Sequence, residues 1–209
     1  MIRVITPASN RALTTLEAAK LEMNIIGTAE DALLSRLIER ASAIAASWCN
    51  RVFARETVEE TFDLSRPSDA LHLSRWPVIT PEVATMGCVE VEEWEAGAED
   101  GICQRLVNDK PVPWPATRIV VRYTAGYVLP GETDDLTPAG YYRLPADVEA
   151  GCLALVRRLY HGRDRDPGIR SVNYGSDSVT YGTFGRLDGE GMPGEVVNLL
   201  SPYWQLKIA

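Results

Sequence analysis

Residues 122–163 constrain the fold most strongly, because they pass from a strand to a helix with clear stop and start signals. The strand, residues 118–123, is rich in β-branched Val and Ile. Loop-forming Pro, Gly and Asp residues follow, and Pro145 then suits the first turn of a helix, where Asp147 and Glu149 favour the positive end of the helix dipole. No catalytic motif lies between strand and helix, so we interpret the stretch as architecture.

Apolar residues at helical spacing predict further helices. A capping box at residues 14–17 starts the first, which ends near Asn24 before Gly27. The second runs from about residue 29 to residue 49, and the third from Pro145 to about Tyr160. The third is apolar enough to be central to a bundle, and a short last helix follows over residues 194–200.

Residues 52–123 change to a period of two, which is typical of strands. We expect five or six short antiparallel strands, followed by a linker over residues 128–143. The sequence thus predicts an α+β fold: a helical bundle of three long helices plus a short C-terminal helix, with an inserted small antiparallel β domain and an extended C-terminal tail. The expected domains are residues 1–52 with 142–170 (bundle), 53–130 (β domain) and 171–209 (tail with the short terminal helix).

Composition and charge exclude several classes of function. The net charge of −8 argues against a protein that grips DNA through a broad basic surface, although it suits one that lets DNA pass without sticking. No run approaches the roughly 18–20 apolar residues that span a bilayer, and the first residues lack a signal-peptide core, so we expect no membrane partner and a cytosolic chain. The four cysteines have no metal-type spacing, and Cys49 and Cys152 fall in apolar helical patterns as small hydrophobes.

Three charged groups and one aromatic group are the candidate sites. The acidic run holds Glu90, Glu92, Glu93, Glu95, Glu99 and Asp100, and a second acidic pair is Asp134 and Asp135. The basic cluster holds Arg157, Arg158, Arg163, Arg165 and Arg170. The aromatic residues of the glycine-rich C-terminal part are Tyr174, Tyr181, Phe184, Tyr203 and Trp204, which pack either on a partner or on the chain's own core.

No pattern indicates catalysis or a cofactor. His161, Asp164 and Asp166 lack the spacing of metal ligands on one helix face. The structural alternative is that they form a charged turn after the end of a helix. His72 falls in an alternating strand, and no nucleophile elbow, phosphate loop or dinucleotide fingerprint is present. We therefore expect no enzyme, no cofactor and no metal.

The order of these features resembles the head–tail connector (adaptor, or head completion) proteins of tailed bacteriophages and related prophage elements. Four segments carry the resemblance: residues 13–20 with 31–34 and the helix ending at Asn50 and Arg51; residues 71–78; residues 121–127 with 144–148 and 159–163; and residues 197–203. They cover most of the chain in the expected order. The departure is size, because minimal family members are little more than the helices.

The resemblance implies a structural protein of the virion neck, present in the host cytoplasm during assembly. It implies a homo-oligomeric ring, commonly of twelve subunits, under the portal protein, with a stopper or tail-completion protein below it. The resemblance also implies that genome DNA passes through the lumen without specific binding, and it supplies no catalytic residues to carry over.

Residue roles within such a ring are hypotheses. Arg163, Arg165, Arg170 and the five aromatic residues would bind a partner, and Glu90, Glu92, Glu93 and Glu95 would face the lumen. The alternatives from other classes are a DNA-binding regulatory or packaging protein that uses the basic cluster, and a metal-dependent hydrolase that uses His161 and its neighbouring aspartates.

Overall fold

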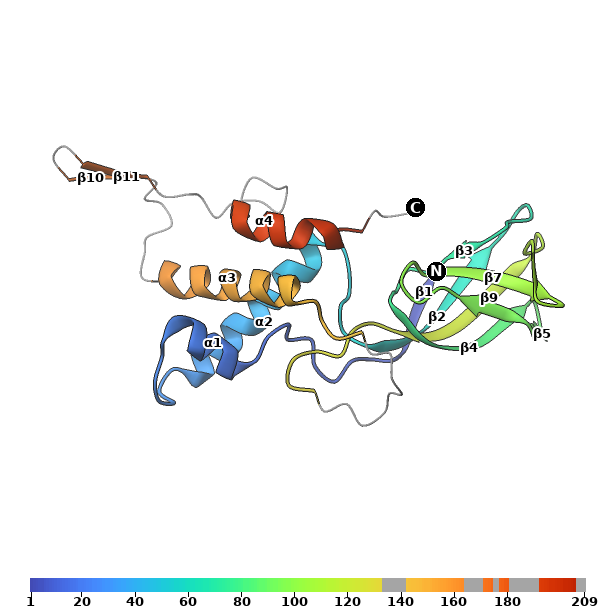
Figure 1. The fold of residues 1–209 in the computed structure, drawn as a ribbon, viewed down its shortest axis with the longest axis horizontal. Coiled ribbons are helices and arrows are strands. Elements are labelled where there is room, and N and C mark those ends of the chain that lie inside the picture. Colours follow the sequence, from blue (N-terminus) through green and yellow to red (C-terminus); the bar gives the residue numbers. More distant parts are fainter. Residues whose placement is uncertain (133–141, 164–170, 175–176, 181–191, 206–209) are drawn as a thin grey trace. The chain divides into compact units, whose positions relative to one another are not determined.

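The computed structural model describes residues 1–132, 142–163, 171–174, 177–180 and 192–205. The chain divides into two compact units (Figure 1). One comprises Met1–Asn10 and Val52–Arg143, and the other comprises Arg11–Arg51 and Leu144–Ala209. The first holds both of the larger sheets and the second holds the helices, and each is described by itself below.

The helical unit contains α1 (Leu16–Met23), α2 (Asp31–Trp48), α3 (Ala146–Gly162) and α4 (Gly194–Leu200), with a 3₁₀ turn at Ser201–Tyr203. α3 packs against each of the other three helices (Figure 1). A short antiparallel hairpin, β10 (Ser171–Tyr174) with β11 (Asp177–Thr180), also belongs to this unit. α3 is therefore the helix around which the unit is built.

Apolar stripes explain why these helices pack as they do. α2 buries Leu34, Ile38, Ala41, Ser42 and Ala45, which recur at helical spacing. α3 buries Val148, Gly151, Cys152, Leu155, Val156 and Leu159. The first helix is capped by Thr15 rather than Thr14: the Thr15 hydroxyl accepts a bond from the amide of Ala18 at 3.1 Å. The Thr14 hydroxyl donates instead to Glu149 on α3 at 3.0 Å, so it ties the start of α1 to the central helix.

The β unit consists of two antiparallel sheets. The five-stranded sheet has the order β1 (Ile2–Thr6), β2 (Glu56–Asp63), β9 (Arg118–Ala125), β4 (Val78–Met86) and β5 (Val89–Glu90). The other has the order β3 (Leu71–His72), β7 (Ile102–Val107) and β6 (Trp94–Ala96), and β8 (Lys110–Val112) also pairs with β7.

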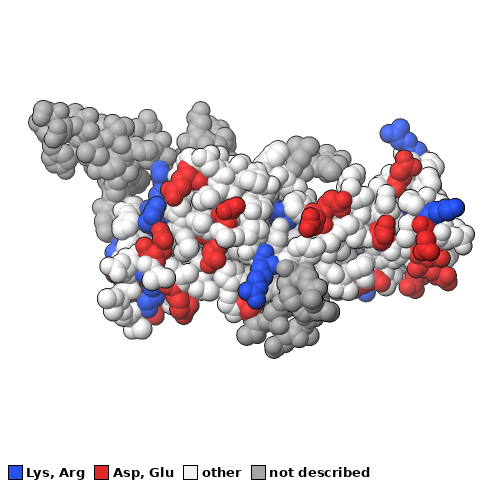
Figure 2. Space-filling model, in the orientation of Figure 1, with Lys and Arg blue, Asp and Glu red and all other residues white. Residues whose placement is uncertain are grey.

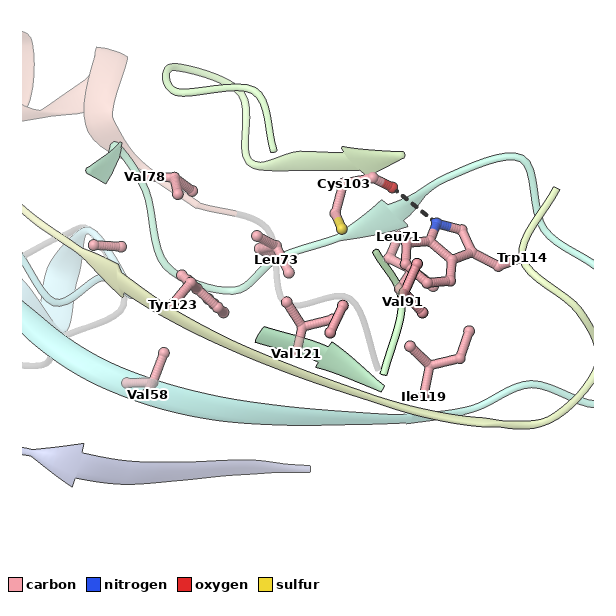
Figure 3. Packing of buried hydrophobic residues seen from close by; sticks show 12 residues of the cluster. Val58, Leu71, Leu73, Val78, Val91, Cys103, Trp114, Ile119, Val121 and Tyr123 are labelled. Carbon is pink, nitrogen blue, oxygen red and sulfur yellow. Dashed lines mark hydrogen bonds between the residues drawn. The ribbon is translucent and has the colours of Figure 1, made fainter. Parts of the chain in front are cut away.

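The core of the β unit lies where inward side chains of both sheets meet (Figure 3). β9 contributes every second residue, from Ile119 to Ala125, and β7 contributes Cys103. Trp114 is fully buried, and its indole N–H donates to the carbonyl oxygen of Cys103 at 3.2 Å. The one polar atom of this large side chain is thus satisfied inside an apolar core.

A carboxyl group is buried at the edge of this core. Glu60 on β2 is 5% exposed, and its Oε2 accepts from the Tyr123 hydroxyl at 2.8 Å and from the Ser74 amide at 2.9 Å. The Ser74 hydroxyl donates to the other carboxylate oxygen. The Tyr123 oxygen in turn accepts from the amide of Arg75 at 3.2 Å. This network joins β2, β9 and the segment after β3 through satisfied polar groups.

The fold class predicted from the sequence is wrong. Only α2 and α3, with 18 and 17 residues, are long among the described helices, whereas α1 has eight residues. The β part is no small insert: its two antiparallel sheets contain nine strands, and strand content equals helix content over the described residues. Five or six strands were expected where β2 to β9 lie, because strands of three residues such as β6 and β8 are too short to display a period of two. The strand β1 comes from the N-terminal residues, which were given no strand. The region expected as an extended tail contains β10, β11 and α4.

Gly151 allows α3 and α4 to approach closely, so we predict that Gly151→Val destabilises the helical unit. A Cβ at this position would lie 3.1 Å from Cδ2 and 3.2 Å from Cγ of Leu200, and valine adds two further methyl groups against the buried Leu200. Overpacking of this kind costs about 1–3 kcal/mol. Urea denaturation measures the change. Gly162→Val on the same helix is the matched control, because nothing lies within 4 Å of an added Cβ there. Equal losses for the two variants would contradict the close packing.

Tyr123→Phe tests the buried network around Glu60. The change removes a donor to Glu60 and leaves the Arg75 amide without its acceptor, so we expect a loss of about 1–3 kcal/mol in the free energy of unfolding at pH 7. Unchanged stability at pH 7 would contradict the network.

The same variant gives a pH test. Burial and the nearby Glu60 charge raise the pKa of Tyr123 well above its usual range. An unfolded tyrosine ionises near pH 10 while the folded one stays protonated, so the unfolded state binds fewer protons and stability falls as pH rises above about 10. Denaturation curves between pH 8 and 11 should show a shallower alkaline decline for Tyr123→Phe than for the unaltered chain.

Candidate interaction surfaces

The acidic run lies exposed on the β unit, where red atoms gather over its β5 end (Figure 2). Glu90 ends β5, Glu92 and Glu93 lie where the chain leaves the five-stranded sheet for the other one, and Glu95 is in β6. All four side chains are exposed, and Glu95 alternates with the half-buried Trp94 and Ala96. The run therefore forms a solvated acidic surface rather than a buried pair of carboxyl groups.

The two valines that flank Glu90 differ in exposure. Val91 is buried, whereas Val89 is 65% exposed, so the two valines do not share an environment. The strand β5 ends at Glu90, and the amide of Val91 donates to the carbonyl oxygen of Ala84 at 2.8 Å as the chain turns.

Arg157 and Arg163 of the basic cluster are paired with acids on their own unit. Arg157 lies 3.0 Å from Glu22 and 3.6 Å from Glu195, so it links α3 to α1 and α4. Arg163 lies 3.4 Å from Glu30, and its guanidinium carbon is 4.1 Å from the centre of the Tyr160 ring. A hydrogen bond from Tyr160, and then the Arg163 hydrogen bond and charge, lower the pKa of Glu30. The charge of these two arginines is therefore partly offset by neighbouring carboxylates.

Tyr203 and Trp204 lie at the end of the helical unit, on a segment held by main-chain bonds. The Gln205 amide donates to the carbonyl of Cys49 at 2.9 Å, and the Asn50 side chain donates to the Gln205 carbonyl at 3.0 Å. Tyr203 is half-buried, whereas Trp204 is 53% exposed. A large aromatic side chain is thus presented to solvent next to a fixed backbone.

Several predicted site residues lie outside the described residues: Arg165, Arg170, Tyr181, Phe184, Asp134, Asp135, Asp164 and Asp166. Tyr174 is in β10, and only its backbone is described. His161 is exposed and makes an edge contact with the Tyr160 ring at 5.3 Å between centroids. Among the residues that the structure describes, no three His, Cys, Asp or Glu side chains come together as metal ligands. Within the same residues, no helix combines the length and apolar character needed to cross a membrane.

Sequence reasoning missed β1, one of the two edge strands of the five-stranded sheet. All five residues of β1 are exposed, including Ile2, Val4 and Ile5, and Val89 is exposed on β5 at the opposite edge. The alternation of Ile2, Arg3 and Val4 was a signal for β1, but it covers too few residues to distinguish a strand from an extended terminus.

No protein-family profile and no curated protein matches the chain. Solved structures do match, over 100% of this chain and 97% of each matched chain. One is in the neck of an empty gene transfer agent (GTA) particle computed with C6 symmetry, with 17% identity and a TM-score of 0.60. Another is in the virion of a native GTA particle (16%, 0.58), and a third is in the neck of a native particle computed with C12 symmetry (16%, 0.53).

The chain has the fold of a GTA neck structure. The resemblance to head–tail connector proteins that the sequence indicated is confirmed at the level of the fold. At 16–17% identity the similarity shows the fold alone. The roles of single residues therefore follow from this chain's own surfaces.

Proposed function

We propose that the chain is a structural adaptor of the neck of a phage-like particle, where copies form a ring beneath the portal, join the DNA-filled head to the tail and continue the DNA channel. The observation that carries the proposal is the similarity of the complete fold, both units included, to chains from GTA necks. A shared single module would carry less weight, because folds are reused for unrelated functions.

The symmetry of those structures supports the ring. The matched necks were computed with C6 and with C12 symmetry, and we propose twelve copies of this chain around one axis. A ring of identical subunits requires that one surface of each copy contact a different surface of the next. A portal protein above the ring and a stopper or tail-completion protein below it are the partners that this placement implies.

The acidic surface suits the wall of a DNA channel. Glu90, Glu92, Glu93 and Glu95 are exposed on one unit, and the chain carries a net charge of −8. Like charge repels the phosphate backbone and keeps a passing duplex from binding. We propose that the part of this surface that subunit contacts leave open faces the lumen, and that the protein acts structurally rather than as an enzyme.

The DNA-binding alternative is disfavoured by the pairing of Arg157 and Arg163 with acids of their own unit. Counterion release from phosphates needs cations that are free to exchange partners. The arginines are instead part of the packing of α3.

Electron microscopy tests the ring directly. The purified chain is mixed with portal rings of its own particle, and class averages are compared with the portal alone. We expect added density coaxial with the portal and with the rotational order of the neck, because an adaptor ring must continue the channel. Portal rings that remain bare, with the chain at concentrations well above those of assembly, would contradict the function.

Trp204→Ala tests whether the aromatic end of the helical unit meets the portal. An exposed tryptophan on an anchored backbone has the properties of a binding hot spot, whose removal costs about 2 kcal/mol or more, or roughly thirtyfold in affinity. Affinity for portal rings is measured by sedimentation, and thermal melting checks the fold.

Leu21→Ala is the matched control, because Leu21 is an apolar side chain on the same unit that is 84% exposed. We expect portal affinity close to that of the unaltered chain for this control. Equal affinities for Trp204→Ala and the unaltered chain would remove Trp204 from the portal contact.

A further inference from the structure

The strand β1 is an open edge of the five-stranded sheet. Among the described strands it pairs with β2 alone, so one row of its backbone N–H and C=O groups has no strand opposite. Protein edges are commonly protected by proline, charge or bulges. β4 has such protection in Pro81, Glu82 and two register shifts, whereas β1 carries one charged residue, Arg3, no proline and one register shift near its end.

Two apolar side chains of β1 lie on the core side of the sheet without being covered. Ile2 pairs with Glu60 and Val4 pairs with Val58, and both partners on β2 are buried. Directly paired residues point to the same face of an antiparallel sheet. Ile2 and Val4 therefore extend the core face beyond the part that the other sheet covers, and they remain 38% and 40% exposed.

The opposite edge of the same sheet has the matching arrangement. Val89 on β5 pairs with Met86, which packs against the core, so Val89 also lies on the core face, and it is 65% exposed. The next residue, Glu90, pairs with Thr85 and lies on the outer face. Both edges thus carry uncovered apolar side chains on the same face of one sheet.

Charge is complementary on the other face. Arg3 pairs with Glu59, which alternates with the buried Val58 and Glu60, so Arg3 lies on the outer face as Glu90 does. When the two edges of neighbouring copies meet with their core faces on the same side, apolar residues meet apolar residues and Arg3 meets Glu90. Two β1 edges would instead bring together two strands of the same charge.

We propose that β1 of one copy adds to the β5 edge of the next copy, so that the five-stranded sheets of neighbouring subunits join. The contact is heterologous, as a ring requires, and this inference rests on the proposed ring. Four successive antiparallel pairings make β1 and β5 run in the same direction, so the joint between copies is parallel. Its partners on the core face are Ile2, Val4 and Val89, and its ion pair on the outer face is Arg3 with Glu90.

Cysteine cross-linking tests the joint. Cys88 adjoins β5 and is exposed, whereas Cys49, Cys103 and Cys152 are buried, and burial raises the pKa of their thiols to about 12, 12 and 11. Ile2→Cys places a second reactive thiol on β1. A short bis-maleimide added to concentrated protein, and to protein assembled on portal rings, should give a ladder of dimers, trimers and larger species on a denaturing gel, because each copy is linked on two sides.

Three controls make the result specific. Cys88→Ser in the Ile2→Cys chain should abolish the ladder, and dimers that persist would indicate a two-fold β1 contact and overturn the proposal. Val107→Cys, at a position 42% exposed on the other sheet, should give nothing beyond dimers through Cys88. Arg3→Glu or Glu90→Arg should reduce cross-linking roughly fivefold, about the most that an exposed ion pair supplies, and the double variant should restore it.

The joint and the ring fail in distinguishable ways. Rings on the portal by electron microscopy without a ladder would overturn the edge contact and leave the adaptor function standing. A ladder in solution without rings on the portal would support the edge contact and contradict the adaptor function. Absence of both would overturn both.

Discussion

The β unit depends on the pairing of β9 with two neighbours at once. β9 pairs with β2 over its full length and with β4 on its other side, so it is the central strand of the five-stranded sheet. Its alternate residues Ile119, Val121, Tyr123 and Ala125 are all buried in the core. A shift of one residue in its register would turn this whole set to the outer face, so the core fixes the register.

The strand β9 also supplies the tyrosine of the buried polar network, and the residue that follows it, Gly126, allows a close contact between two chain segments. Tyr123 is paired with Val58, and Glu60 follows Val58 by two residues on β2. The side chains of Tyr123 and Glu60 therefore lie on the same face of the sheet, and the Tyr123 hydroxyl reaches Glu60. After β9, Gly126 has φ of +122°, and a Cβ there would lie 2.4 Å from the carbonyl oxygen of Ala54. Glycine is required at this point both for its backbone conformation and for the close approach of two chain segments.

The helices could be predicted from the sequence, whereas several short strands could not. The stripes of α2 and α3 extend over 18 and 17 residues, so helical periodicity is visible, and α4 was placed at its observed bounds. The strands β6 and β8 have three residues each, and long-range pairing rather than local pattern decides them. The burial of Glu60 also lies in the tertiary structure, because nothing local shows that a tyrosine about sixty residues away supplies its partner. The pairing of Arg157 and Arg163 with Glu22, Glu195 and Glu30 likewise depends on how the helices pack.

A covered core and an uncovered edge in the same sheet call for different explanations. Residues such as Val121 are buried because two sheets close over them, and this stabilises the single chain. Ile2, Val4 and Val89 lie on that same core face and contribute little to the single chain, since water still reaches them. Apolar side chains that extend a core past both ends of one sheet, beside opposite charges on its other face, gain their burial when copies meet edge to edge. In a ring every copy has a neighbour on each side, so one contact type covers both edges of every sheet.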